Sequence, residues 1–108
     1  EVSGGQLQRA SICRALINDP EIVIGDEPTG ALNSASAAQV LDIMGEIRAR
    51  GTTVVLVTHD PTVAVRADRV LVLADGKITD DVALGRYSPD AAAERTARVT
   101  SLLASRGV

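Results

Sequence analysis

The sequence predicts an α/β domain with a largely parallel sheet, and three observations lead to this fold class. Short, uninterrupted apolar runs at residues 22–24 and 54–57 are typical of strands in parallel sheets, which are buried on both faces. Segments with helical periodicity precede and separate these runs, and this alternation favours parallel pairing. The hydrophobic content of 45% is enough for a buried core, so the composition excludes a globally disordered chain.

The first half of the chain is expected to form helix, strand, helix and strand in turn. Ser3 and Gln6, three residues apart, fit a capping box at the start of a helix over 4–17. The first apolar run is the first strand. Asn33 is a candidate N-cap for the second helix, which ends at Gly51. The apolar side chains of that helix recur at helical spacing: Ala37, Val40, Leu41, Met44 and Ile47.

The second half is expected to hold a short helix, a hairpin and a last helix. The short helix covers 62–66, and a third strand covers 70–73. Asp75-Gly76 is a strong hairpin signal that leads into a short strand over 77–79. The pair Ser88-Pro89 opens the last helix, because proline suits the first helical position.

Charge and rare residues exclude several classes of protein. The net charge of −3 argues against a protein that coats nucleic acid, and Tyr87 is the only aromatic residue, so no platform for stacking bases is present. Cys13, the single cysteine, cannot form an internal disulfide, and its place on the first helix predicts core packing. The longest apolar stretches are far shorter than the roughly 20 residues of a membrane span.

Three titratable side chains follow the first two predicted strands. Asp26 and Glu27 come after the first strand, and His59 comes after the second. Because ligands of parallel sheets bind at the carboxyl ends of the strands, these side chains are expected to meet at one edge. A carboxylate there suits Mg²⁺ or the activation of a water, and an imidazole suits a phosphate oxygen. The alternative is that the acids lie in a solvated loop and that the histidine is structural.

The first residues allow two interpretations. Ser3, Gly4, Gly5 and Gln6 can simply start a helix. They can also form an anion site, because glycines let the backbone approach a phosphate and a helix N-terminus presents unpaired N–H groups to it.

Taken together, these segments resemble the ATP-binding cassette (ABC) family. Residues 2–6 (VSGGQ) look like its signature motif, and 22–27 look like the Walker B strand with its catalytic glutamate. Residues 31–33 stand where the family has its D-loop, and 57–60 look like the H-loop. The order agrees along residues 1–80. The stretch 26–32 is similar to transporter ATPases for lipoprotein release, macrolide efflux and antimicrobial-peptide resistance.

The resemblance implies a fold, a division of the chain and a set of partners. The fold is the C-terminal part of a P-loop NTPase domain, with helices flanking a largely parallel sheet and with a C-terminal β-hairpin and helix. Residues 1–83 carry the motifs, and 84–108 are a helical extension. The partners are a second nucleotide-binding domain, identical or different, and transmembrane permease subunits, with no nucleic acid. The expected location is peripheral, on the cytoplasmic side of the cell membrane.

The same resemblance implies a role for each site residue. Asp26 would position Mg²⁺, Glu27 would be the general base in ATP hydrolysis, and His59 would contact the γ-phosphate. Asn33 stands where the D-loop usually has aspartate, so it keeps a hydrogen-bond acceptor but loses a charge, which puts coupling between the two ATP sites in doubt. The expected cofactor-binding residues belong to the signature and the D-loop: Ser3, Gly4, Gly5, Gln6 and Asn33.

Other interpretations remain open at this point. One is an ABC-type ATPase that serves DNA repair or translation, and another is a truncated remnant without catalysis. The acidic balance and the lack of aromatic residues favour transport over the nucleic-acid classes. Arg95, Arg98 and Arg106, in the last helix, are expected to form a solvated face.

The 108 residues contain no Gly-x-x-x-x-Gly-Lys-Ser/Thr phosphate loop, and they begin with Glu1 inside a motif. We therefore expect a fragment that alone neither binds ATP tightly nor hydrolyses it. Titration of the purified chain with MgATP, together with a phosphate-release assay, checks this expectation. Micromolar affinity in a preparation free of contaminating ATPases would contradict it.

Overall fold

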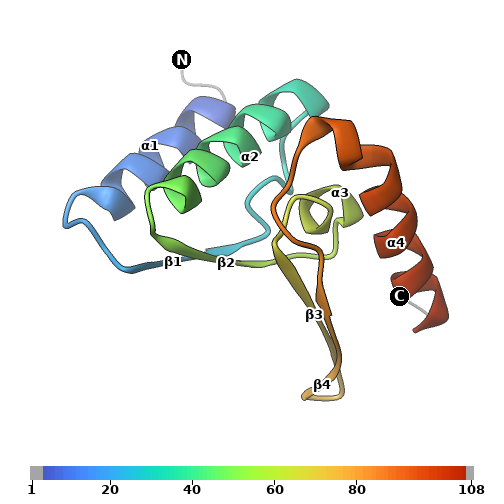
Figure 1. Ribbon diagram of the computed structural model, residues 1–108. Coiled ribbons are helices and arrows are strands. Elements are labelled where there is room, and N and C mark those ends of the chain that lie inside the picture. The colour runs from blue at the N-terminus through green and yellow to red at the C-terminus, as the bar shows by residue number, and fades with distance from the viewer. Residues whose placement is uncertain (1–3, 107–108) are drawn as a thin grey trace. The chain divides into compact units, whose positions relative to one another are not determined.

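A computed structural model describes residues 4–106, which lie in two compact units, Glu1–His59 and Asp60–Val108 (Figure 1). The first unit contains four elements: α1 (Gly4–Leu16), β1 (Ile22–Asp26), α2 (Ser34–Ala49) and β2 (Thr53–Val57). The second unit contains five: α3 (Pro61–Ala64), β3 (Arg69–Ala74), β4 (Lys77–Ala83), the 3₁₀ helix η1 (Pro89–Ala91) and α4 (Ala92–Ser105). The predicted cap at Ser3 lies outside the described residues.

The strands β1 and β2 pair in parallel, as the apolar runs predicted. Their register runs from Ile22 opposite Thr53 to Asp26 opposite Val57. Gly25 lies within β1, where a Cβ atom would come within 3.0 Å of the Leu56 side chain on the neighbouring strand. A larger residue at this position would therefore require Leu56 to move.

The helices α1 and α2 lie side by side over one face of this sheet (Figure 1). The predicted apolar stripe of α2 is confirmed, because Val40, Leu41, Met44 and Ile47 are all buried. Ile12 of α1 joins Val40, Met44 and Ile47 in one hydrophobic cluster. The core prediction for Cys13 is wrong, since this side chain is exposed. Successive helical residues are about 100° apart around the axis, so burial of Ile12 turns its neighbour away from α2.

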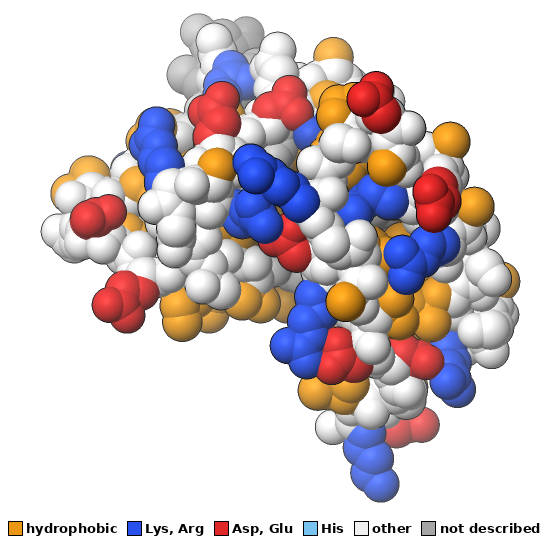
Figure 2. All heavy atoms as spheres, in the orientation of Figure 1, with side chains coloured by type: hydrophobic (Ala, Val, Ile, Leu, Met, Phe, Trp, Pro, Cys, Tyr) orange, Lys and Arg blue, Asp and Glu red, His pale blue; other side chains and the backbone are white. Residues whose placement is uncertain are grey.

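The other face of the parallel sheet is apolar and exposed. Relative exposure is 56% for Ile22, 73% for Ile24, 45% for Val55 and 51% for Val57. Figure 2 shows hydrophobic side chains along the lower edge of the left-hand part of the molecule, where Figure 1 places β1 and β2. Parallel sheets normally carry a layer on both faces. Within residues 4–59, helices cover only one of the two faces.

The second unit is built on an antiparallel hairpin. Asp75 and Gly76 both have positive φ, at 53° and 75°, which is the backbone of the tight hairpin turn that this dipeptide predicted. The strand β4 extends to Ala83, beyond the predicted end at residue 79. The polar residues of its second half interrupt the apolar pattern from which a strand is predicted. The structure pairs one of them, Asp81, with Arg69 on β3.

Arg95 is the main correction to the sequence analysis in this unit. It was expected on a solvated face, yet it is only 4% exposed. Its guanidinium group donates hydrogen bonds to four backbone carbonyl oxygens, those of Val65, Ala67, Leu84 and Gly85, at 2.5–2.9 Å. Its Cζ atom also lies 5.4 Å from the centroid of the Tyr87 ring. Arg95 therefore joins α4 to the segments that follow α3 and β4.

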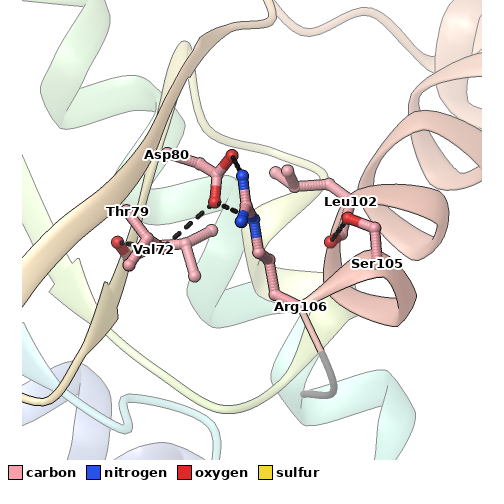
Figure 3. A network of polar contacts seen from close by, with 6 residues as sticks. All are labelled: Val72, Thr79, Asp80, Leu102, Ser105 and Arg106. Carbon is pink, nitrogen blue, oxygen red and sulfur yellow. Dashed lines mark hydrogen bonds and ion pairs between the residues drawn. The ribbon is translucent and has the colours of Figure 1, made fainter.

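Arg98 is exposed as expected, whereas Arg106 forms an ion pair with β4. Two nitrogens of Arg106 contact the two carboxylate oxygens of Asp80, with Nη2–Oδ1 at 2.8 Å and Nε–Oδ2 at 2.6 Å (Figure 3). These contacts lower the pKa of Asp80, and a hydrogen bond from Thr79 acts in the same direction. This bidentate pair connects the residue after α4 to the hairpin.

We expect Arg95→Met to destabilise the second unit by about 3 kcal/mol, because four buried or partly buried carbonyl groups would lose their donor. Chemical denaturation of the chain, followed by the fluorescence of Tyr87, measures this loss. Tyr87 is the only aromatic residue and lies against Arg95, so it reports on this unit. The matched control Arg98→Met should change stability by less than about 0.5 kcal/mol. Equal effects of the two substitutions would contradict the role of Arg95.

Candidate active site

The candidate site lies where β1 and β2 end. The backbone N–H of Glu27 donates to the carbonyl oxygen of Val57 at 2.7 Å, so the parallel pairing continues one residue past the end of β1. The next residues on the neighbouring strand are Thr58 and His59. The carboxyl edge of the sheet therefore brings Glu27 and His59 together, as the sequence predicted.

The backbone of Glu27 has an unusual conformation. Its φ is +47°, in the left-handed region that costs a non-glycine residue roughly 1 kcal/mol or more. A turn follows directly, in which Gly30 N–H donates to the carbonyl oxygen of Glu27 at 3.1 Å. Backbone hydrogen bonds on both sides of the peptide thus hold Glu27 in this conformation.

Both carboxylate oxygens of Glu27 accept hydrogen bonds from the residues after β2. The Thr58 hydroxyl donates to Oε2 at 3.0 Å, and the His59 backbone N–H donates to Oε1 at 2.7 Å. The ring Nδ1 of His59 lies 2.6 Å from the same Oε1. An ionised carboxylate can only accept, so this contact requires the proton on Nδ1 and leaves Nε2 for another group.

These contacts favour the ionised form of Glu27. The hydrogen bond from the His59 ring, and then those from the His59 backbone and the Thr58 hydroxyl, hold the pKa of Glu27 below its usual value. Glu27 is therefore ionised at neutral pH, with its side chain about one-third exposed. An ionised and accessible carboxylate can accept a proton from a water molecule.

Asp26 is the last residue of β1 and is exposed. Among residues 4–106, no group of three or more His, Cys, Asp or Glu side chains is arranged to hold a metal ion. Mg²⁺ often binds one or two carboxylates and completes its shell with water and phosphate oxygens. Asp26 fits that mode as one ligand, and a site made only of protein ligands does not fit the described residues.

The remaining predicted site residues fall into two groups. Gly4, Gly5 and Gln6 form the start of α1, as expected, and Ser3 lies outside the described residues. The hydrogen bonds of the Glu27 carboxylate described here come from Thr58 and His59 and not from these residues. Asn33 is the N-cap of α2, where its Oδ1 accepts a hydrogen bond from Ser36 N–H at 2.8 Å. A cap satisfies an otherwise unpaired helix N–H, so Asn33 has a structural role whatever its role toward a ligand.

Thr58 has no role that the sequence pattern predicts, but the structure places it against the Glu27 carboxylate. The available signal was its position between a predicted strand and His59. Thr58 follows β2, and Glu27 follows the neighbouring parallel strand β1. Only the register of the two strands shows that the Thr58 hydroxyl can reach Glu27.

Comparison with known proteins identifies the family. The sequence model described as "ABC transporter" matches residues 1–30. A probable export ATP-binding/permease protein MacB from Pseudomonas entomophila is 56% identical over 81 residues, which are 75% of this chain and 12% of that protein. The chain belongs to the ABC transporter family. The resemblance that the motifs indicated is therefore confirmed.

Further relatives of this ABC chain carry similar descriptions. A macrolide export ATP-binding/permease protein MacB 1/2 from Paracoccus denitrificans is 53% identical over 90 residues, covering 83% of this chain and 14% of that protein. A probable export ATP-binding/permease protein from Pseudomonas fluorescens is 45% identical across the whole chain and 17% of its own length. The ABC chain thus spans less than one-fifth of the length of these curated relatives.

Solved structures confirm the fold class. A dimeric ATP-binding cassette in a post-hydrolysis state, bound to ADP and Pi, matches with a TM-score of 0.69 and 39% identity, over 80% of this chain and 38% of that one. Helices on a parallel sheet, followed by a hairpin and a helix, are what the ABC resemblance implied. No helix among residues 4–106 of the ABC chain has the length and hydropathy needed to cross a membrane.

Substitution of Asn33 tests its capping role in α2. We expect Asn33→Ala to lower the free energy of unfolding by about 1 kcal/mol, because the N–H of Ser36 loses its acceptor. Asn33→Asp should stay within about 0.5 kcal/mol of the original, since aspartate caps as well as asparagine. Chemical denaturation measures both, with Ser34→Ala as the neighbouring control. A stable Asn33→Ala variant would show that the cap contributes little.

Proposed function

We propose that the chain is the C-terminal part of the ATP-binding subunit of an ABC exporter, and that the complete protein hydrolyses ATP to drive transport across a membrane. The observation that carries the proposal is the contact of the Glu27 carboxylate with His59 at the carboxyl edge of the sheet. The relatives named as export ATP-binding/permease proteins support it, and they favour transport over DNA repair or translation.

In this proposal Glu27 is the general base. Its carboxylate is ionised at neutral pH, and hydrogen bonds from His59 and Thr58, which lower its pKa, further favour that form; the ionised carboxylate can take a proton from the water that attacks the γ-phosphate of ATP. His59 contacts the γ-phosphate through Nε2, the ring nitrogen that the Glu27 contact leaves available. Asp26 would hold Mg²⁺, which would neutralise phosphate charge when bound.

The partners follow from the relatives and the neighbouring structures. The matched cassette is described as dimeric and bound to ADP and Pi, which supports a second nucleotide-binding domain for this protein. The signature residues Ser3, Gly4, Gly5 and Gln6, together with Asn33, would then serve ATP at the interface of the two domains. The description of a relative as an ATP-binding/permease protein supports association with membrane-spanning permease segments. In this proposal the domain lies peripherally, on the cytoplasmic side of the membrane.

In the full-length protein that contains this chain, we expect Glu27→Gln to reduce ATP turnover by at least about a hundredfold while ATP binding persists. The amide keeps the shape of the side chain but cannot accept the proton. Steady-state phosphate release and equilibrium binding of a labelled nucleotide measure the two properties.

The matched control is Glu46→Gln, which makes the same change at an exposed position on α2. It should leave turnover within about twofold of the original. Normal turnover in the Glu27→Gln protein would show that Glu27 is not the general base. Loss of nucleotide binding along with turnover would instead show that Glu27 acts in binding or folding.

A further inference from the structure

Thr58 is the first residue after β2, and the sheet holds its backbone close to Glu27. The residue before it, Val57, accepts the Glu27 backbone N–H at 2.7 Å and lies opposite Asp26 in the parallel register. Thr58 is half-buried, and its hydroxyl reaches Oε2 of Glu27 at 3.0 Å. The backbone pairing therefore places a hydroxyl donor beside the carboxylate.

The two oxygens of Glu27 are held in different ways. Oε2 accepts from the half-buried Thr58, whereas Oε1 accepts from His59 through its backbone N–H and its ring. The ring of His59 is almost fully exposed, with 94% of its side-chain surface accessible. Oε1 is therefore held by a residue with an exposed ring, while Oε2 is held by a half-buried residue next to the sheet.

We propose that Thr58 is a positioning residue for Glu27, whose hydroxyl anchors Oε2 and so directs Oε1 toward the attacking water. This inference rests on the proposed function, because it takes Glu27 to be the base. A base must stay within hydrogen-bond reach of the water from which it takes the proton. A carboxylate without an anchor can rotate about its last bonds, and it then spends less time in the productive orientation.

The test uses the full-length protein with Thr58→Val, which removes the hydroxyl and keeps the shape of the side chain. We expect kcat for ATP hydrolysis to fall roughly tenfold or more, which is the range for a lost hydrogen bond to a charged group, while KM for ATP stays within about twofold. Thr58→Ser keeps the hydroxyl and should restore kcat to within about threefold of the original.

Thr53→Val is the matched control. It makes the same substitution at the exposed first residue of the same strand, at the end far from Glu27, and should leave kcat and KM unchanged. If Thr58→Val does not yield folded protein, Thr58→Ala replaces it in the comparison with Thr58→Ser. The split between kcat and KM, together with rescue by serine, is not expected from a residue that only supports the fold.

Three results would overturn the inference: an unchanged kcat in Thr58→Val, an equal loss of kcat in Thr58→Ser, or a rise in KM that matches the fall in kcat. Glu27→Gln is assayed beside these variants. If it is inactive while Thr58→Val is fully active, the role of Thr58 is wrong and the proposed base stands. If Glu27→Gln is fully active, the base assignment fails, and the role of Thr58 fails with it.

Discussion

The parallel pairing of β1 with β2 is the constraint on which the candidate site depends. Its register sets Asp26 opposite Val57, so Glu27 and the residues after β2 leave the sheet at the same edge. The hydrogen bond from Glu27 N–H to Val57 extends that pairing and helps to hold a left-handed backbone at Glu27. A slip by one residue would place Glu27 beside a different pair of side chains. The hydrophobic cluster under α1 and α2 opposes such a slip, because Val54 and Leu56 pack against it.

The strain at Glu27 is offset by a local network rather than by burial. The carboxylate accepts three hydrogen bonds from two consecutive residues, and the turn through Gly30 holds the carbonyl group. Strained backbone tends to occur at functional sites, where the surroundings determine it more than once. Here the surroundings leave the carboxylate ionised and accessible, which are the properties that a general base requires.

Residue type and helical spacing did not determine the burial of two helical side chains. Cys13 and Arg95 were each assigned from residue type and helical spacing, yet Cys13 is exposed and Arg95 is buried. Helical spacing predicts that one side of a helix is buried but does not say where that side ends. It also does not predict that four backbone carbonyls will converge on one guanidinium group. The second half of β4 was missed because Asp80 and Asp81 do not alternate with apolar residues, although each finds an arginine partner in the fold.

Local properties of the sequence were sufficient for the fold class, the family, the stripe of α2, the hairpin turn and the prediction that Glu27 and His59 lie close together. These depend on apolar runs, periodicity and motifs, which are short-range features of the chain. Only the tertiary structure decided which groups meet. The register of two strands that lie about 30 residues apart in the chain sets Thr58 against Glu27. A hydrogen bond requires atoms within about 3 Å of each other, and sequence spacing does not determine that distance.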